Sequence, residues 1–144
     1  MSRKMAVALM AVSMVFSISV ASQAHGSVDG FFTLPRRTGT NTLVVDTGAS
    51  SSDQHNSIKN VVTFQRKSGS SWIKFHDYLA GDCCNTTGFT DTAFTACNGT
   101  ATGTATYRTK WETWWYNDAG GVAHHKGPSF SNGVSISNTT CYND

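Results

Sequence analysis

The chain has 144 residues, of which 14% are charged, with a formal net charge of +2 and four cysteines. This length fits one small domain and excludes an enzyme with a separate cofactor domain. The low charge content excludes a coiled coil or a charge-rich disordered tail as the main structure.

Residues 1–24 have the composition of a secretory signal peptide. A basic start at Arg3 and Lys4 precedes an almost uncharged apolar stretch over 5–20, and small residues precede the expected cleavage point after Ala24. The alternative is an uncleaved anchor, for which the apolar stretch is slightly short and lacks an aromatic or basic flank on its far side. We therefore predict a protein secreted to an extracellular or periplasmic space, with no membrane span after cleavage.

The remaining residues, 25–144, are predicted to form a single β-sandwich domain. Nine basic side chains there balance nine acidic ones, and basic runs are no longer than pairs such as Arg36-Arg37, so we expect no nucleic-acid partner. The domain has no Met and only one Glu, whereas Thr, Ser, Gly, Val and aromatic residues are abundant, as is typical of strands and turns. We predict an all-β fold, a small antiparallel β-sandwich for which an immunoglobulin-like topology is one candidate and a small β-barrel is the rival.

Cleavage after Ala24 would make His25 the first residue of the mature chain. A chain that begins His-Gly is similar to the secreted copper monooxygenases and copper-carrier sandwiches, whose N-terminal histidine chelates the metal. The resemblance implies a Cu(II) site of terminal amine and imidazoles, with the second imidazole from His55, His76, His124 or His125. The alternative is that His25 is a solvated terminal residue, and we predict no metal and no cofactor.

Strands are predicted first around Phe31-Phe32 and from Thr42 to Val45. The second runs into Leu-Val-Val-Asp-Thr-Gly-Ala-Ser over 43–50, which resembles the active-site signature of aspartic proteases. In that family two aspartates share a proton, so the resemblance implies a homodimer in which each copy contributes Asp46. The alternative is that this Asp-Thr-Gly ends a strand, with the aspartate accepting backbone N–H bonds and the glycine at positive φ.

Apolar residues between Ile58 and Phe64, and again between Trp72 and Leu79, flank Lys67-Ser68-Gly69-Ser70. This pattern predicts two strands joined by a short turn. The following segment, 81–103, is rich in Thr, Gly, Asn and Cys and is predicted to be a long ordered loop.

The four cysteines are Cys83, Cys84, Cys97 and Cys141. An even number of cysteines in a secreted chain predicts two disulfides. A bridge between adjacent residues is strained, so we predict that Cys83 and Cys84 pair with Cys97 and Cys141, in one order or the other.

Side chains alternate from residue 107 to residue 117. One parity reads Tyr107, Thr109, Trp111, Thr113, Trp115, and the other reads Arg108, Lys110, Glu112, Trp114, Tyr116. We predict that the first parity faces the core and that the second binds a protein or a glycan through Trp114, Tyr116, Arg108 and Lys110. The alternative is that a second sheet or loop covers these rings. A turn at Gly120-Gly121 and a last strand outlined by Phe130, Val134 and Ile136 complete the expected fold.

The predicted function is therefore that of a monomeric, secreted, disulfide-stabilised β domain that binds a protein, a glycan or a surface ligand without catalysis. The alternatives are a homodimeric aspartic-protease-like enzyme that uses Asp46 and a copper protein that uses His25. Phosphate-binding loops and Gly-x-Ser-x-Gly elbows are absent, and a single Glu112 excludes the paired glutamates of a retaining glycosidase.

Overall fold

The computed structural model describes residues 26–39, 41–97, 103–137 and 141, which contain seven β-strands and no helix. The strands are β1 (Asp29–Phe32), β2 (Arg36–Thr38), β3 (Thr42–Ser68), β4 (Ser71–Ala96), β5 (Thr104–Tyr116), β6 (Ala123–Phe130) and β7 (Val134–Ser137). The prediction of an all-β fold is thus confirmed. Over the same ranges, no helix is long and apolar enough to cross a membrane.

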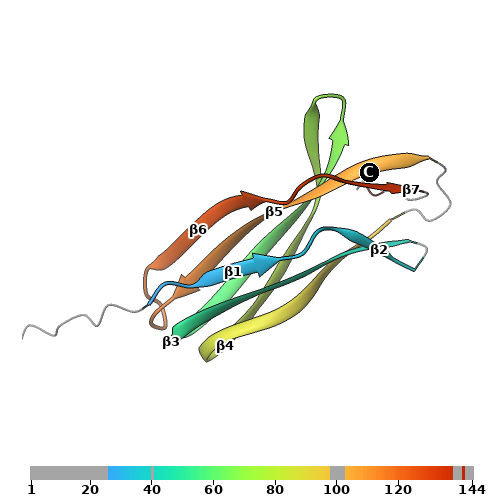
Figure 1. Ribbon diagram of the computed structural model, residues 1–144. Coiled ribbons are helices and arrows are strands. Elements are labelled where there is room, and N and C mark those ends of the chain that lie inside the picture. The colour runs from blue at the N-terminus through green and yellow to red at the C-terminus, as the bar shows by residue number, and fades with distance from the viewer. Residues whose placement is uncertain (1–25, 40, 98–102, 138–140, 142–144) are drawn as a thin grey trace, which may run out of the picture.

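The seven strands form one antiparallel sheet built around the long β3–β4 hairpin (Figure 1). β4 pairs with β3 from Ser68↔Ser71, at the turn, to Thr42↔Ala96, at the far end. β1 and β2 pair with the first half of β3, β5 pairs with its second half, and β6 and β7 pair with β5. The sheet curls into a half-barrel, an arrangement between the predicted sandwich and its barrel rival.

The predicted hairpin turn is confirmed, but the strands on both sides of it are longer than predicted. Gly69 takes a φ of 58° at the turn, where a residue without a side chain avoids strain. The predicted loop over 81–103 is wrong, because β4 continues to Ala96 and pairs there with the first half of β3. Threonine is abundant in this part of β4, and its β-branched side chain suits an extended backbone.

The β3–β4 hairpin bends near its middle and thereby creates the core. The bend coincides with two register shifts. Ser57 pairs with Cys83 but His55 pairs with Thr86, which leaves one extra residue on β4, and Ser50 pairs with Gly88, which leaves three extra residues on β3 before His55. The two halves of β3 then share one apolar cluster, which consists of Leu43, Val45, Val62, Phe64, Phe75, Ala93, Tyr107, Ile136 and Cys141. A smaller cluster of Val28, Ala49 and Ile58 packs against Trp115 and Phe89.

A buried polar contact also joins the two halves of β3. Asn60 is completely buried, and its Nδ2 donates to Thr47 Oγ1 at 2.9 Å and to the Gly48 carbonyl at 2.8 Å. Its Oδ1 accepts from Thr113 Oγ1 of β5 at 2.8 Å. The Asn60 amide therefore links three backbone segments inside the curled sheet.

The cysteines form one disulfide, between Cys97 and Cys141, so the prediction of two disulfides is wrong. Cys83 and Cys84 are exposed free thiols in the bend of β4. Cys97 directly follows the same strand, and the regularly paired stretch from Gly88 to Ala96, about 27 Å of extended backbone, separates it from the bend. Neither Cys83 nor Cys84 can therefore reach Cys97, which meets Cys141 after β7 instead.

The end of the chain follows the sequence prediction in outline. Gly121 N donates to the Asp118 carbonyl at 3.1 Å in the predicted turn between β5 and β6. The predicted last strand is divided, since Phe130 ends β6 and Val134 begins β7.

Candidate functional site

The side of the sheet opposite the core carries the residues that the sequence predicts to bind. On β5, Arg108, Lys110, Glu112, Trp114 and Tyr116 alternate with buried side chains and are all partly exposed. Because paired residues share a face, the register adds Lys59 of β3, Leu79 and Gly81 of β4 and His125 of β6 to the same side. We call these nine residues the outer face. The partial exposure of its β5 residues means that no second layer buries them within the described chain.

Trp114 lies near the centre of the outer face, between Lys59 on β3 and His125 on β6. Its ring stacks on the His125 imidazole, with centroids 4.1 Å apart and an interplanar angle of 28°. Stacked rings on paired strands restrict each other's rotation. The indole is therefore held in place while part of it remains exposed.

Glu112 supplies a charged group beside this stack. Its Oε2 lies 3.1 Å from Lys110 Nζ, and its Oε1 lies 3.5 Å from His125 Nε2. The three side chains are between 21% and 32% exposed, so they are accessible and yet fixed by one another. Hydrogen-bonding groups of both kinds, donors and acceptors, are thus positioned within reach of the Trp114 ring.

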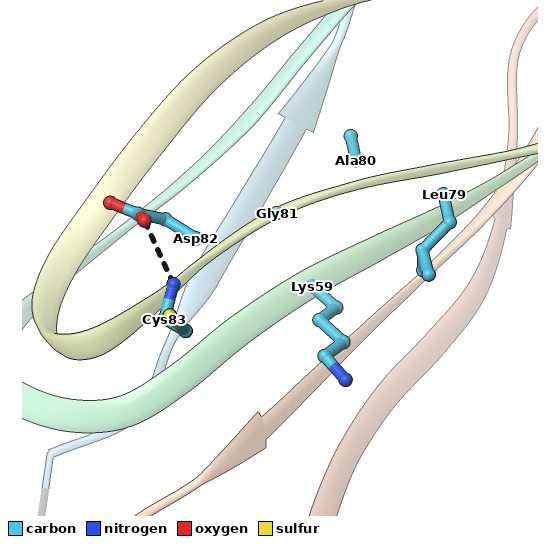
Figure 2. Close-up of a pocket in the computed structure, with 6 residues that line it drawn as sticks. All are labelled: Lys59, Leu79, Ala80, Gly81, Asp82 and Cys83. Atoms are coloured by element: carbon cyan, nitrogen blue, oxygen red, sulfur yellow. Dashed lines mark hydrogen bonds between the residues drawn. The ribbon is translucent and has the colours of Figure 1, made fainter.

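Tyr116 and Lys59 form the next part of the outer face. The Lys59 ammonium lies 5.7 Å from the centroid of the Tyr116 ring, within the range of a cation–π contact. Lys59 also borders a hollow of about 300 Å³, and Figure 2 shows its side chain on the same side of the sheet as Leu79. Leu79 is 64% exposed at the rim, which makes it the most exposed apolar side chain of the outer face.

Arg108 lies at the opposite end of the β5 row. Its Cζ lies 4.3 Å from the centroid of the Trp72 ring and 4.5 Å from that of Phe130, and its Nε donates to Gln65 Oε1 at 2.7 Å. Desolvation by burial lowers the pKa of Arg108, although an arginine keeps its charge in proteins. The sequence pattern predicts Arg108 but not Trp72 and Phe130, because Trp72 approaches Arg108 across the pairing of β5 with β3 and Phe130 approaches it through the register of β6 on β5.

The aspartate of the Asp-Thr-Gly motif is the fifth residue of β3, where it pairs with Thr92, and the strand continues past it to Ser68, so the proposed strand end at this point is wrong. Arg36 contacts both carboxylate oxygens, with its two terminal nitrogens 2.8 Å and 3.1 Å away, and Thr92 Oγ1 donates to Oδ1 at 3.0 Å. The hydrogen bond from Arg36 is the main cause that holds the pKa of Asp46 below its usual range. The carboxylate is therefore ionised and engaged at neutral pH.

Two of the candidate histidines lie near each other, because the Asn117 amide contacts both His55, at 3.0 Å, and His124, at 3.3 Å, whereas His125 stacks on Trp114. His25 lies outside the described residues. His55 is buried, with Nε2 2.8 Å from Ser51 Oγ and Nδ1 3.0 Å from Asn117 Oδ1. In the described ranges, no group of three or more His, Cys, Asp or Glu side chains is placed to hold a metal ion.

Comparisons with known proteins do not assign the chain to a family. No protein-family model, no curated protein and no solved structure matches the chain significantly.

Proposed function

We propose that this protein is a non-catalytic binding domain whose ligand lies on the outer face. The observation that supports the proposal most strongly is the stack of Trp114 on His125, next to the Lys110–Glu112 ion pair. These groups are partly exposed and hold one another in place, so binding would cost little side-chain entropy. A strand face with fixed, partly exposed rings beside hydrogen-bonding groups suits recognition of a ligand surface.

Among possible ligands, we propose a glycan. Aromatic rings pack against the apolar faces of sugars, while neighbouring carboxylate, ammonium and imidazole groups bond to hydroxyls. Residues on one face of a strand recur about every 6.8 Å, so Lys110 and Tyr116 lie about 20 Å apart along β5. This length could accommodate several consecutive sugar units of an extended chain.

A protein partner is the second candidate, and Leu79 is the observation that favours it. This side chain is 64% exposed and lies on the same face as Val61 and the aromatic rings. Apolar and aromatic side chains surrounded by charged ones are also the composition of protein interfaces. A protein ligand would cover Leu79, whereas a glycan on β5 would not need it.

We further propose that the protein acts outside the cytosol and as a monomer. The predicted signal peptide over 1–24 and the disulfide between Cys97 and Cys141 both support export to an oxidising compartment. The alternative of a protease dimer is less well supported, because Arg36 engages both oxygens of Asp46. In such a dimer, each Asp46 would have to leave Arg36 in order to meet the Asp46 of the second copy. A copper site at His25 would be tested by adding Cu(II) to the secreted protein and recording its native mass.

The proposed function is tested by screening the secreted protein against immobilised polysaccharides of different composition. The affinity of single-residue variants is then measured for the polysaccharide that the wild type binds most tightly. W114A should weaken binding at least about tenfold, in keeping with the loss of a central aromatic contact. The matched control is F94A, which removes a 54% exposed ring that is not part of the outer face and should leave the affinity unchanged. L79S distinguishes the two candidates, since it should weaken binding of a protein but not of a glycan.

A further inference from the structure

The two free cysteines lie in an unusual part of the β4 backbone. Cys83 pairs with Ser57, but the next pair joins Thr86 to His55, so Cys84 and Asn85 bulge out of the ladder. Cys84 has a φ of 72° and Asn85 a φ of 66°, which are left-handed conformations that few non-glycine residues adopt. Consecutive strained residues of this kind are concentrated at functional sites.

This backbone changes where the two thiols point. Adjacent side chains of a regular strand project from opposite faces of the sheet and do not meet. The left-handed conformation of Cys84 interrupts that alternation, and its side chain hydrogen-bonds with the Cys83 thiol and thereby raises the pKa of Cys83. Both thiols are also exposed, so small reagents in solution can reach them.

The surroundings of Cys83 leave room for such a reagent. Cys83 lies at the rim of the hollow that Lys59, Leu79 and Gly81 also line (Figure 2). Gly81 contributes no side chain to this space. The Cys83 backbone N–H donates to the Asp82 carboxylate at 2.8 Å, which helps to fix the main chain beside the thiol.

We propose that Cys83 and Cys84 form a reversible redox site, at which a small-molecule disulfide converts the two thiols into a vicinal disulfide. The other two cysteines are already joined to each other, so each of these thiols has the other as its nearest partner. Their fixed proximity favours closure of the ring over attack by a second protein molecule. The Cα atoms of adjacent residues are about 3.8 Å apart, less than in ordinary disulfides, so the bond should be reduced readily.

The reaction is a pair of thiol–disulfide exchanges. One cysteine loses its proton and its thiolate attacks a sulfur of oxidised glutathione, forming a mixed disulfide and releasing one glutathione thiolate, which takes up a proton. The second cysteine then loses its proton, attacks the protein-bound sulfur and releases the second glutathione. Two protein thiols are oxidised to one disulfide, and one molecule of oxidised glutathione is reduced to two thiols.

The test equilibrates the full folded protein in buffers of varied reduced and oxidised glutathione, traps remaining thiols with an alkylating reagent and measures the intact mass. The wild type should lose both alkylation sites together and become lighter by two hydrogen atoms, with a Cys83–Cys84 bridge in the peptide map. C84S should instead accumulate a single glutathione adduct on Cys83, because the resolving thiol is missing. C83S/C84S should show neither product and keep the native circular-dichroism spectrum, as a control for folding.

Three results of the equilibration would overturn the proposal, and a fourth would come from the peptide map. They are a wild-type protein that retains two stable glutathione adducts, one that accumulates as a disulfide-linked dimer in place of the internal bridge, and one whose two thiols remain reduced at every buffer ratio. Bridges from Cys83 or Cys84 to Cys97 or Cys141 would likewise contradict it.

Discussion

Trp114 and His125 stack across the β5–β6 pair, with their ring centroids 4.1 Å apart. The same imidazole approaches Glu112, whose other oxygen contacts Lys110, so four side chains from two strands form one connected group. None of them depends on a flexible loop for its position. The centre of the outer face is therefore fixed before any ligand arrives.

H125A should weaken ligand binding by about threefold to tenfold, because the Trp114 ring loses the imidazole that fixes its plane. Isothermal titration calorimetry of both proteins against the same ligand would measure the change. The matched control is H124A, since His124 stacks on Trp115, which packs against the smaller core cluster. An equal loss in H124A and H125A would argue against a specific role for this stack.

Substitution of Asn60 should affect stability strongly. N60A removes three hydrogen bonds, two that the Asn60 amide donates and one that it accepts. The buried hydroxyls of Thr47 and Thr113 and the Gly48 carbonyl each lose a partner. Stranded buried polar groups of this kind cost about 1–3 kcal/mol each, so we expect a loss of about 3 kcal/mol in the free energy of unfolding. Urea denaturation would measure it, with N132A, at an exposed asparagine, as the control that should change little.

Removal of the disulfide should destabilise the domain without changing its fold. C97S/C141S opens a link between residues 44 positions apart, for which the chain-entropy estimate is about 4 kcal/mol. The Cys141 N–H also donates to the buried Tyr107 hydroxyl at 3.1 Å, so the end of the chain should detach from the core in this variant. Thermal melts and hydrogen exchange near Tyr107 would detect both effects, and an unchanged melting temperature would contradict them.

The ion pair between Arg36 and Asp46 predicts a small dependence of stability on pH. Because the hydrogen bond from Arg36 lowers the pKa of Asp46 in the folded state, the carboxylate stabilises the fold above its unfolded pKa. This contribution should disappear as the pH falls below about 4, through the lower folded pKa. The pair is largely exposed, so wild type should exceed D46N by at most about 0.5 kcal/mol at pH 7 and by nothing at pH 2. A difference that grows toward acid pH would have the wrong sign.

Local patterns predicted those parts of the fold that depend on neighbouring residues. The alternation from Tyr107 to Tyr116 correctly placed Trp111 inside and Trp114 on the other side of β5, since side chains of a strand alternate regardless of its partners. The hairpin around Gly69 was likewise visible as two apolar runs on either side of a short turn.

Features that depend on long-range pairing were not predictable in this way. The bend of the β3–β4 hairpin coincides with two adjacent register shifts, between Ser50 and His55 and between His55 and Ser57, and no periodicity in the sequence marks them. Because the bend could not be foreseen, the Thr-rich segment after Gly81 was not recognised as a strand. For the same reason, Cys83 was not excluded as a partner of Cys97. The contact of Arg108 with Trp72 and Phe130 also requires the register of four strands, β3, β4, β5 and β6.

The most direct test of the outer face is to map the bound ligand by nuclear magnetic resonance. The 15N-labelled protein would be titrated with the glycan that binds best in the polysaccharide screen, and amide and indole N–H shifts would be followed. We predict that the largest changes cluster at Lys59, Glu112, Trp114 and His125, and that they vanish in W114A. Changes concentrated around Asp46 on the first half of β3, with the Trp114 indole signal unmoved at saturation, would contradict binding at the outer face.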